Sequence, residues 1–183
     1  MARPCDFLMI LVLMSYWSTC SLGCVLNTTD ETLFKLLVPK KQSSPRFYLE
    51  DRDDFLCPLQ EMDAQQIQKP QVIQVLQELT EQSLLLFTSD ESYAAWEITL
   101  LEKFCEALDK QLEKLQTCPV QQVGVQEHPQ SQQHPVKKYF MRITEYLREK
   151  KHSPSAWEVV KVEIMRAWSF SDNLIKELSK KEE

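Results

Sequence analysis

Glycine is the residue that most limits what this chain can fold into. The 183 residues contain only two glycines, and just one of them, Gly124, lies beyond residue 23. Phosphate-binding loops and tight two-residue hairpins both depend on the positive φ angles that glycine adopts easily. The scarcity of glycine therefore disfavours nucleotide-binding folds and hairpin-rich β folds, and it favours a chain built from helices.

The N-terminal residues have the pattern of a secretory signal peptide. After a basic start, residues 7–17 (FLMILVLMSYW) are apolar, and Ser21 and Gly23 place small residues at the two positions that a signal peptidase reads. The apolar run is too short to span a bilayer. We therefore predict that residues 1–23 are removed and that residues 24–183 form one secreted domain with a sizeable core and no membrane insertion.

The polar residues give no sign of catalysis or of a bound metal ion. The three histidines, His128, His134 and His152, lie in polar segments, and there is no HExxH or GxSxG motif. The adjacent acids Asp53 and Asp54 are typical of surface charge. A formal net charge of -6 disfavours nucleic acid as a partner, because phosphate binding needs a concentrated basic face. We therefore predict a binding protein that is not an enzyme and has no cofactor.

Apolar residues recur at helical spacing in one short and four long segments. These segments are residues 32–38, 71–87, 96–115, 136–147 and 157–178. Ser89 supplies N-cap chemistry for the third, and Pro39 ends the first. Residues 40–66 and 120–135 lack the pattern and would be long connections. Because no strand pattern appears, the sequence predicts an all-α fold: five helices in a bundle of the four-helix type, with long overhand connections.

The last helical segment has apolar residues on two faces. One face is the stripe expected of a helix that lies on a core, and it contains Trp157, Val160, Ile164, Ala167 and Trp168. The opposite face should be polar. Instead, Val162 and Met165 lie there among charged side chains, which indicates a second packing or binding role.

The four cysteines beyond residue 23 point to disulfide bonds. Cys24, Cys57, Cys105 and Cys118 are an even number in an oxidising compartment, and they allow two disulfides with three possible pairings. Asn27 begins an Asn-Thr-Thr sequon, so it is a predicted N-glycosylation site.

Several segments, taken in order, closely resemble the type I interferons of mammals. They are LEDRDDFLCP (49–58), QKPQVIQVLQEL (68–79), AAWEITLLEKF (94–104), VKKYFMRITEYLREKKHSPSAWEVVKVEIMR (136–166) and SFSDNL (169–174). The resemblance covers nearly all of the chain after residue 23. It implies a monomeric α-helical cytokine that bridges the two chains of the type I interferon receptor, whose Janus kinases then start an antiviral and antiproliferative response.

The resemblance also implies two receptor-binding surfaces. The residues that match the family's surface for the higher-affinity chain are Leu49, Arg52, Lys161, Val162, Met165, Arg166 and Ser169. A methionine and an aliphatic residue flanked by cations suit an interface anchor with a charged rim. The alternative is that Val162 and Met165 only cover a neighbouring loop.

The positions that match the lower-affinity surface lie elsewhere on the chain. They are Leu84, Leu85, Ser89, Leu100 and Lys137. Leu84 and Leu85 belong to a run of three leucines. A helix with a single apolar stripe would have a polar residue at one or more of these three positions. For Leu100, a place in the core is an equal alternative.

The chain departs from the family in its cysteines and in its first helix. The family bridge that remains maps to Cys24 and Cys118, whereas Tyr48 and Ser155 stand where the family's second disulfide would be. We expect Cys57 and Cys105 to pair instead; the alternatives are a buried free thiol at Cys105 and a Cys57 that is free or bridges two molecules. The short first helix resembles delta-type interferons, and an alternative function is a receptor-binding antagonist or a placental signal.

Overall fold

The computed structural model describes residues 55–63, 65–118 and 135–182 of the chain. These residues form a 3-10 helix, η2 (Pro58–Glu61), and five α-helices: α3 (Lys69–Phe87), α4 (Asp90–Ala95), α5 (Ile98–Gln116), α6 (Pro135–Glu149) and α7 (Pro154–Glu182). The described part of the chain contains no strand, so the predicted all-α class is confirmed. The helix expected at residues 32–38 lies outside the described residues, as do residues 40–54 and 64 of the first expected connection and residues 120–134 of the second.

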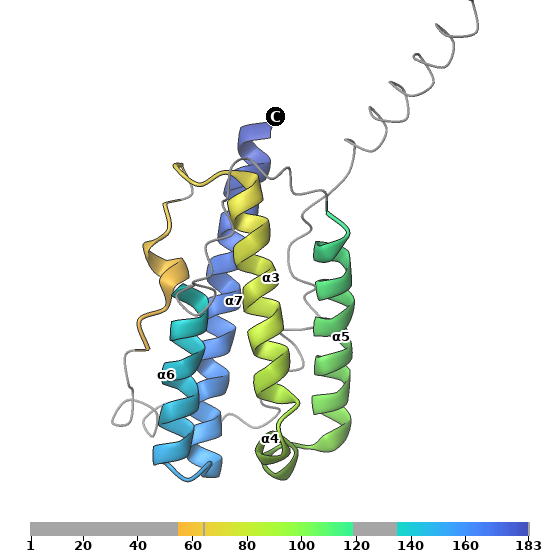
Figure 1. Ribbon diagram of the computed structural model, residues 1–183, viewed down its shortest axis with the longest axis vertical. Helices are drawn as coiled ribbons and strands as arrows, with labels where there is room; N and C mark the ends of the chain where they lie inside the picture. The colour runs from red at the N-terminus through yellow and green to blue at the C-terminus, as the bar shows by residue number, and fades with distance from the viewer. Residues whose placement is uncertain (1–54, 64, 119–134, 183) are drawn as a thin grey trace, which may run out of the picture.

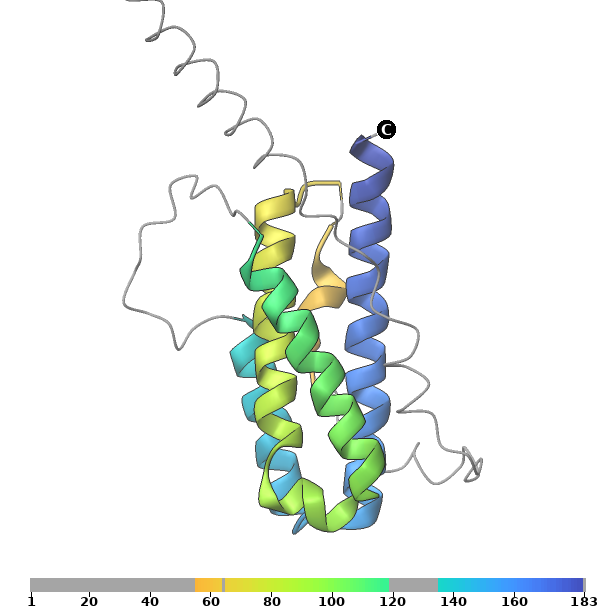
Figure 2. The same ribbon diagram turned by 90° about the vertical axis from the view of Figure 1, so that its right-hand side faces the viewer.

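Four long helices form an elongated bundle (Figure 1). Helix α3 packs against α5, α6 and α7, and α6 also packs against α7. Figures 1 and 2 show that α3 and α6 run in one direction and that α5 and α7 run in the other, while α4 links α3 to α5 at one end. The short η2 packs on α6 and α7. Within the described residues, no helix combines the length and apolar character needed to cross a membrane.

The helices begin and end where local chemistry allows. Gln68 and Gln71 form a capping box at the start of α3, in which the Gln68 amide donates to Gln71 Oε1 at 3.0 Å. The predicted break between the last two helices is confirmed, because α6 ends at Glu149 and α7 begins at Pro154. The turn between them closes with the His152 amide donating to Leu147 O at 2.7 Å.

The helix expected over residues 96–115 is interrupted at its start. Ser89 does act as an N-cap, accepting from the Ser92 amide at 3.3 Å, but it caps the short α4 rather than the long helix. Trp96 ends α4 in an extended conformation, with φ -116° and ψ 157°. Its ring meets those of Phe87 and Trp157 edge to face, with centroids 5.4 and 6.4 Å apart. Because this aromatic packing fixes Trp96 across the bundle end, the long helix begins only at Ile98.

The core is formed by the predicted apolar stripes of all four long helices. Its largest fully buried side chains are Leu76, Leu79, Phe87, Leu101, Leu108, Tyr139, Ile143, Leu147 and Ile164. Phe104 adds a second edge-to-face contact with Phe87, at 4.9 Å between centroids. On α7 the expected stripe is confirmed: Trp157, Val160, Ile164, Ala167 and Trp168 are all buried.

Candidate functional site

The second face of α7 is exposed, as its sequence pattern indicates. Val162 is 53% exposed although it is apolar, and Ser169 is exposed two turns further along. Met165 and Arg166 are half-buried between them. The spacing i, i+3, i+4 and i+7 puts these four residues on one side of the helix. The helix therefore presents an aliphatic residue, a methionine and a cation together.

Lys161 lies apart from this face. It is only 7% exposed, its Nζ lies 4.9 Å from the centroid of the Trp96 ring, and it pairs with Glu158 Oε1 at 3.4 Å. A lysine over a tryptophan face gains a cation–π attraction while its aliphatic stem covers apolar surface. The structure thus gives Lys161 a packing role between α7 and the end of α4, a role that its place among charged residues in the sequence did not indicate.

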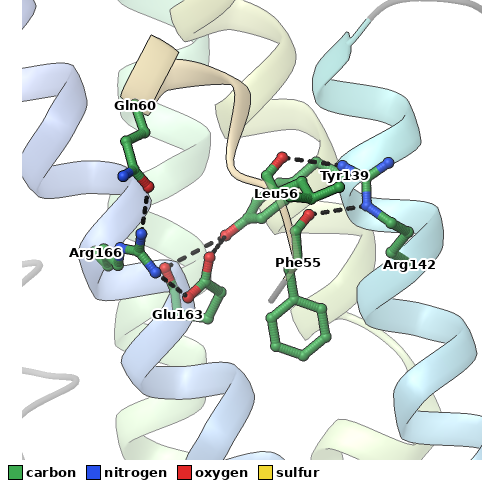
Figure 3. Close-up of polar contacts among 7 residues, drawn as sticks. All are labelled: Phe55, Leu56, Gln60, Tyr139, Arg142, Glu163 and Arg166. Carbon is green, nitrogen blue, oxygen red and sulfur yellow. Dashed lines mark hydrogen bonds and ion pairs between the residues drawn. The ribbon is translucent and has the colours of Figure 1, made fainter. Parts of the chain in front are cut away.

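Arg166 joins α7 to the chain segment before α3 (Figure 3). Its Nη2 donates to Gln60 Oε1 on η2, its Nη1 pairs with Glu163 Oε2 at 3.5 Å, and its guanidinium lies 5.6 Å from the Phe170 ring centroid. Leu49 and Arg52 lie outside the described residues. The described end of the same connection nevertheless packs directly on the α7 face, which is the arrangement that a surface combining the two segments requires.

A buried carboxylate supports Arg166 from the core side. Glu163 is buried, and its Oε1 accepts a hydrogen bond from the Tyr139 hydroxyl at 3.0 Å. Burial, and secondly the negative charge of Glu163, raise the pKa of Tyr139 well above its usual range. The phenol therefore stays protonated as a donor. The hydroxyl, the carboxylate and the guanidinium thus link α6, α7 and η2.

A second arginine holds the connection on the side of α6. Arg142 donates from Nε to the Phe55 carbonyl at 2.8 Å and from Nη2 to the Leu56 carbonyl at 3.0 Å (Figure 3). Phe55 is buried and meets the Tyr146 ring edge to face, at 5.2 Å between centroids. The segment that precedes η2 is therefore attached by one polar and one aromatic contact, both from α6.

Four of the five residues predicted for the second surface lie on three helices, α3, α5 and α6. Leu85 on α3 is 61% exposed, Leu84 is half-buried against the core, and Leu100 on α5 is half-buried. Lys137 on α6 pairs with Glu78 of α3 at 3.8 Å. Since Glu78 and Leu85 are seven residues apart, they lie on the same side of α3, about 10 Å apart along its axis. Ser89 is half-buried and serves as the α4 cap.

The predicted bridge between Cys57 and Cys105 is wrong, because both thiols are free. Cys57 is buried just before η2, whereas the half-buried Cys105 directs its Sγ to Phe87 O at 3.8 Å. Segments η2 and α5 lie on opposite sides of the bundle (Figures 1 and 2), so the two sulfurs cannot meet. Burial raises the pKa of both thiols. Cys118 is disulfide-bonded, and its predicted partner, Cys24, lies outside the described residues.

The described residues hold no group of three or more histidine, cysteine, aspartate or glutamate side chains that could bind a metal ion. Asn27 lies outside the described residues, as do the boundaries predicted at residues 23 and 24.

Comparison with known proteins supports a cytokine. Residues 25–178 match the family model described as the interferon alpha/beta domain. This chain belongs to the interferon alpha/beta family. Human interferon alpha-7 and interferon alpha-14 are each 47% identical to it over 189 aligned positions, which cover 100% of both chains. The family is one of helical cytokines and not of enzymes, so the predicted class is confirmed.

Sequence reasoning missed the polar residues that attach the connection to this interferon's bundle. Tyr139 belongs to the apolar stripe predicted for residues 136–147, so only its ring is expected to matter. Glu163 lies beside a stripe position of α7, and Arg142 and Gln60 have the pattern of ordinary surface residues. The available signal is Glu163, which directly precedes the stripe residue Ile164. A carboxylate so close to the core-facing stripe is expected to be partly buried, and a buried charge needs a polar partner.

Proposed function

We propose that this chain is a secreted cytokine that bridges the two chains of the type I interferon receptor. The α7 face, together with the end of the connection, would bind the higher-affinity chain. The surface near Leu85, Lys137 and Leu100 would bind the other. Bringing the receptor tails together would activate their Janus kinases and start an antiviral and antiproliferative response.

One observation carries the assignment of the higher-affinity surface. Val162, Met165, Arg166 and Ser169 share one side of α7, and the Arg166 hydrogen bond to Gln60 attaches the connection to that side. Val162 is exposed beside a methionine and a cation, and apolar anchors with a charged rim are typical of protein interfaces. We infer that Leu49 and Arg52 complete the surface from the connection and that Lys161 contributes by holding its edge.

The remaining features belong to the same proposal. Removal of residues 1–23 would release a monomeric domain over residues 24–183, with a Cys24–Cys118 bridge and a glycan on Asn27. N-terminal sequencing and intact mass of the secreted protein, before and after glycosidase treatment, test these points. A first residue other than Cys24 would refute the proposed cleavage.

Binding to the isolated receptor chains tests the surface. Val162→Asp should weaken binding to the soluble ectodomain of the higher-affinity chain by about 1–3 kcal/mol, because it puts an unpaired charge at the centre of the contact. Arg166→Ala should act in the same direction.

Two matched changes on other helices serve as controls. Ile98→Asp makes the same apolar-to-acid change on α5, where Ile98 is 56% exposed. Arg148→Ala removes an exposed arginine from α6. Equal binding by Val162→Asp and Ile98→Asp, with unchanged helical circular dichroism, would contradict the proposed surface. Receptor-dependent reporter induction in cells separates an agonist from an antagonist that binds without signalling.

A further inference from the structure

Leu56 has an unusual backbone and an unusual exposure. Its φ is 51°, in the left-handed region that a leucine rarely occupies, and its side chain is 60% exposed. Phe55 before it and Cys57 after it are both buried. Two buried neighbours and a left-handed residue between them turn the leucine side chain outward.

Arg142 binds the backbone at this position. Its Nε and Nη2 donate to the consecutive carbonyls of Phe55 and Leu56, at 2.8 and 3.0 Å. A planar guanidinium can bind two neighbouring carbonyls at once, and its rigid fork sets the orientation of both peptide groups. A strained backbone persists only where the surroundings determine it. Here the fork and the burial of Phe55 and Cys57 do so.

Leu56 lies on the segment that Arg166 attaches to the α7 face. The segment from Leu56 enters η2, where Gln60 accepts the hydrogen bond from Arg166. Figure 3 shows the two attachments of this segment, Arg142 of α6 at Phe55 and Leu56 and Arg166 of α7 at Gln60. An apolar side chain is thus exposed on a short segment that α6 and α7 both hold.

We propose that Leu56 is an apolar, specificity-determining contact for the higher-affinity receptor chain and that Arg142 is its positioning residue. This inference rests on the proposed function and extends its surface from α7 to the edge of α6. Leu56 would fill an apolar recess on the receptor chain. Arg142 itself need not touch the receptor, because it acts by holding the two carbonyls.

Truncation of an aliphatic residue at two similarly exposed positions tests the contact. Leu56→Ala should weaken binding to the higher-affinity ectodomain by about tenfold, in the range of interface anchors. Ile98→Ala is the matched control, since Ile98 on α5 is 56% exposed, and it should leave this affinity unchanged. Equal affinities of Leu56→Ala and the unmodified protein would overturn the inference.

Leu56→Gly separates binding from folding. Glycine adopts a φ of 51° without strain, so this variant should unfold at the same or a higher denaturant concentration. It should still lose about tenfold in affinity, because the side chain is gone. A folded variant that keeps full affinity would show that the leucine side chain makes no contact.

A double-mutant cycle tests the positioning role of Arg142. Arg142→Ala should weaken binding by about threefold to tenfold and should leave binding to the lower-affinity chain unchanged. In the Leu56→Ala background the same change should have little further effect, because the group that Arg142 positions is already missing. Fully additive losses would overturn the positioning role.

The two proposals can fail separately. If Val162→Asp and Arg166→Ala weaken binding and Leu56→Ala does not, the inference about Leu56 is wrong and the proposed surface stands. If only Leu56→Ala weakens binding, the contact stands and the assignment of the α7 face is wrong.

Discussion

The hydroxyl of Tyr139 should contribute measurably to the stability of the bundle. Tyr139 is fully buried and donates to Glu163 Oε1 at 3.0 Å, and the other partner of that carboxylate, Arg166 Nη1, is further away at 3.5 Å. Tyr139→Phe removes the donor but keeps the ring, which meets Phe140 edge to face at 5.4 Å between centroids. Glu163 then stays buried with one partner fewer.

The expected loss follows from the type of hydrogen bond. A bond to a charged acceptor contributes about 1.5–3 kcal/mol, and a buried group left unsatisfied costs a similar amount. We therefore expect Tyr139→Phe to lower the free energy of unfolding by about 2 kcal/mol, which is a fall in Tm of about 4–8 °C for a domain of this size. The measurement is urea unfolding followed by circular dichroism, with an unchanged m-value. Tyr93→Phe, at an exposed position on α4, should change stability by less than about 0.5 kcal/mol.

The pH dependence gives a second measurement of the same bond. The pKa of Tyr139 is raised above its ordinary value of 10.0, first by burial and then by Glu163. The folded state therefore holds this proton more tightly than the unfolded state. Its contribution is fully present below pH 10.0 and is lost as the pH rises further. The stability gap between the original protein and Tyr139→Phe should narrow above pH 10. Identical unfolding midpoints at neutral pH would refute this account of Glu163.

Three further predictions concern other residues. Two thiols per native monomer should react with an alkylating reagent, Cys105 before the more deeply buried Cys57, and both slowly because burial raises their pKa; a disulfide-linked peptide containing both would contradict the structure. Lys161→Ala should lower stability by about 0.5–2 kcal/mol through lost packing on Trp96, as measured by urea unfolding, and a receptor defect with full stability would place Lys161 in the interface instead. Leu85→Ala and Lys137→Ala should reduce ternary-complex formation on cells more than binding to the higher-affinity chain, and normal signalling by both would refute the second surface.

The sequence could predict whatever depends on helical periodicity. The stripe of α7 predicted both its core face and the exposure of Val162, because an apolar residue on the opposite side cannot reach the same core. The break between α6 and α7 followed from Ser153 and Pro154. In contrast, the end of α4 at Trp96 depends on aromatic contacts with Phe87 and Trp157. Phe87 and Trp157 come from other helices, so the sequence around Trp96 does not indicate these contacts.

The pairing of the cysteines also depends on tertiary packing that the sequence does not reveal. An even number of cysteines in an oxidising compartment favours pairing, and that argument predicted a bridge between Cys57 and Cys105. Pairing also requires the two Cα atoms to lie within about 7 Å of each other. The side of the bundle on which η2 and α5 lie is set by tertiary packing, so counting could not show that the thiols lie apart.

The polar contacts around Glu163 explain how the α7 face and the segment before α3 are held together. Arg166 meets Gln60 of η2 on one side and Glu163 on the other, and Glu163 is held in turn by Tyr139 from the core. Arg142 holds the start of the same segment by donating hydrogen bonds to the carbonyls of Phe55 and Leu56. The chain has Tyr48 and Ser155 where the resemblance places a second disulfide, and so it lacks that covalent tie. Such a tie would restrict the same connection. In the described residues, the two arginines and the buried Phe55 ring limit its movement against α6 and α7. The position of the described part of the connection therefore depends on the hydrogen bonds of Arg142 and Arg166, and a substitution at either arginine should loosen it.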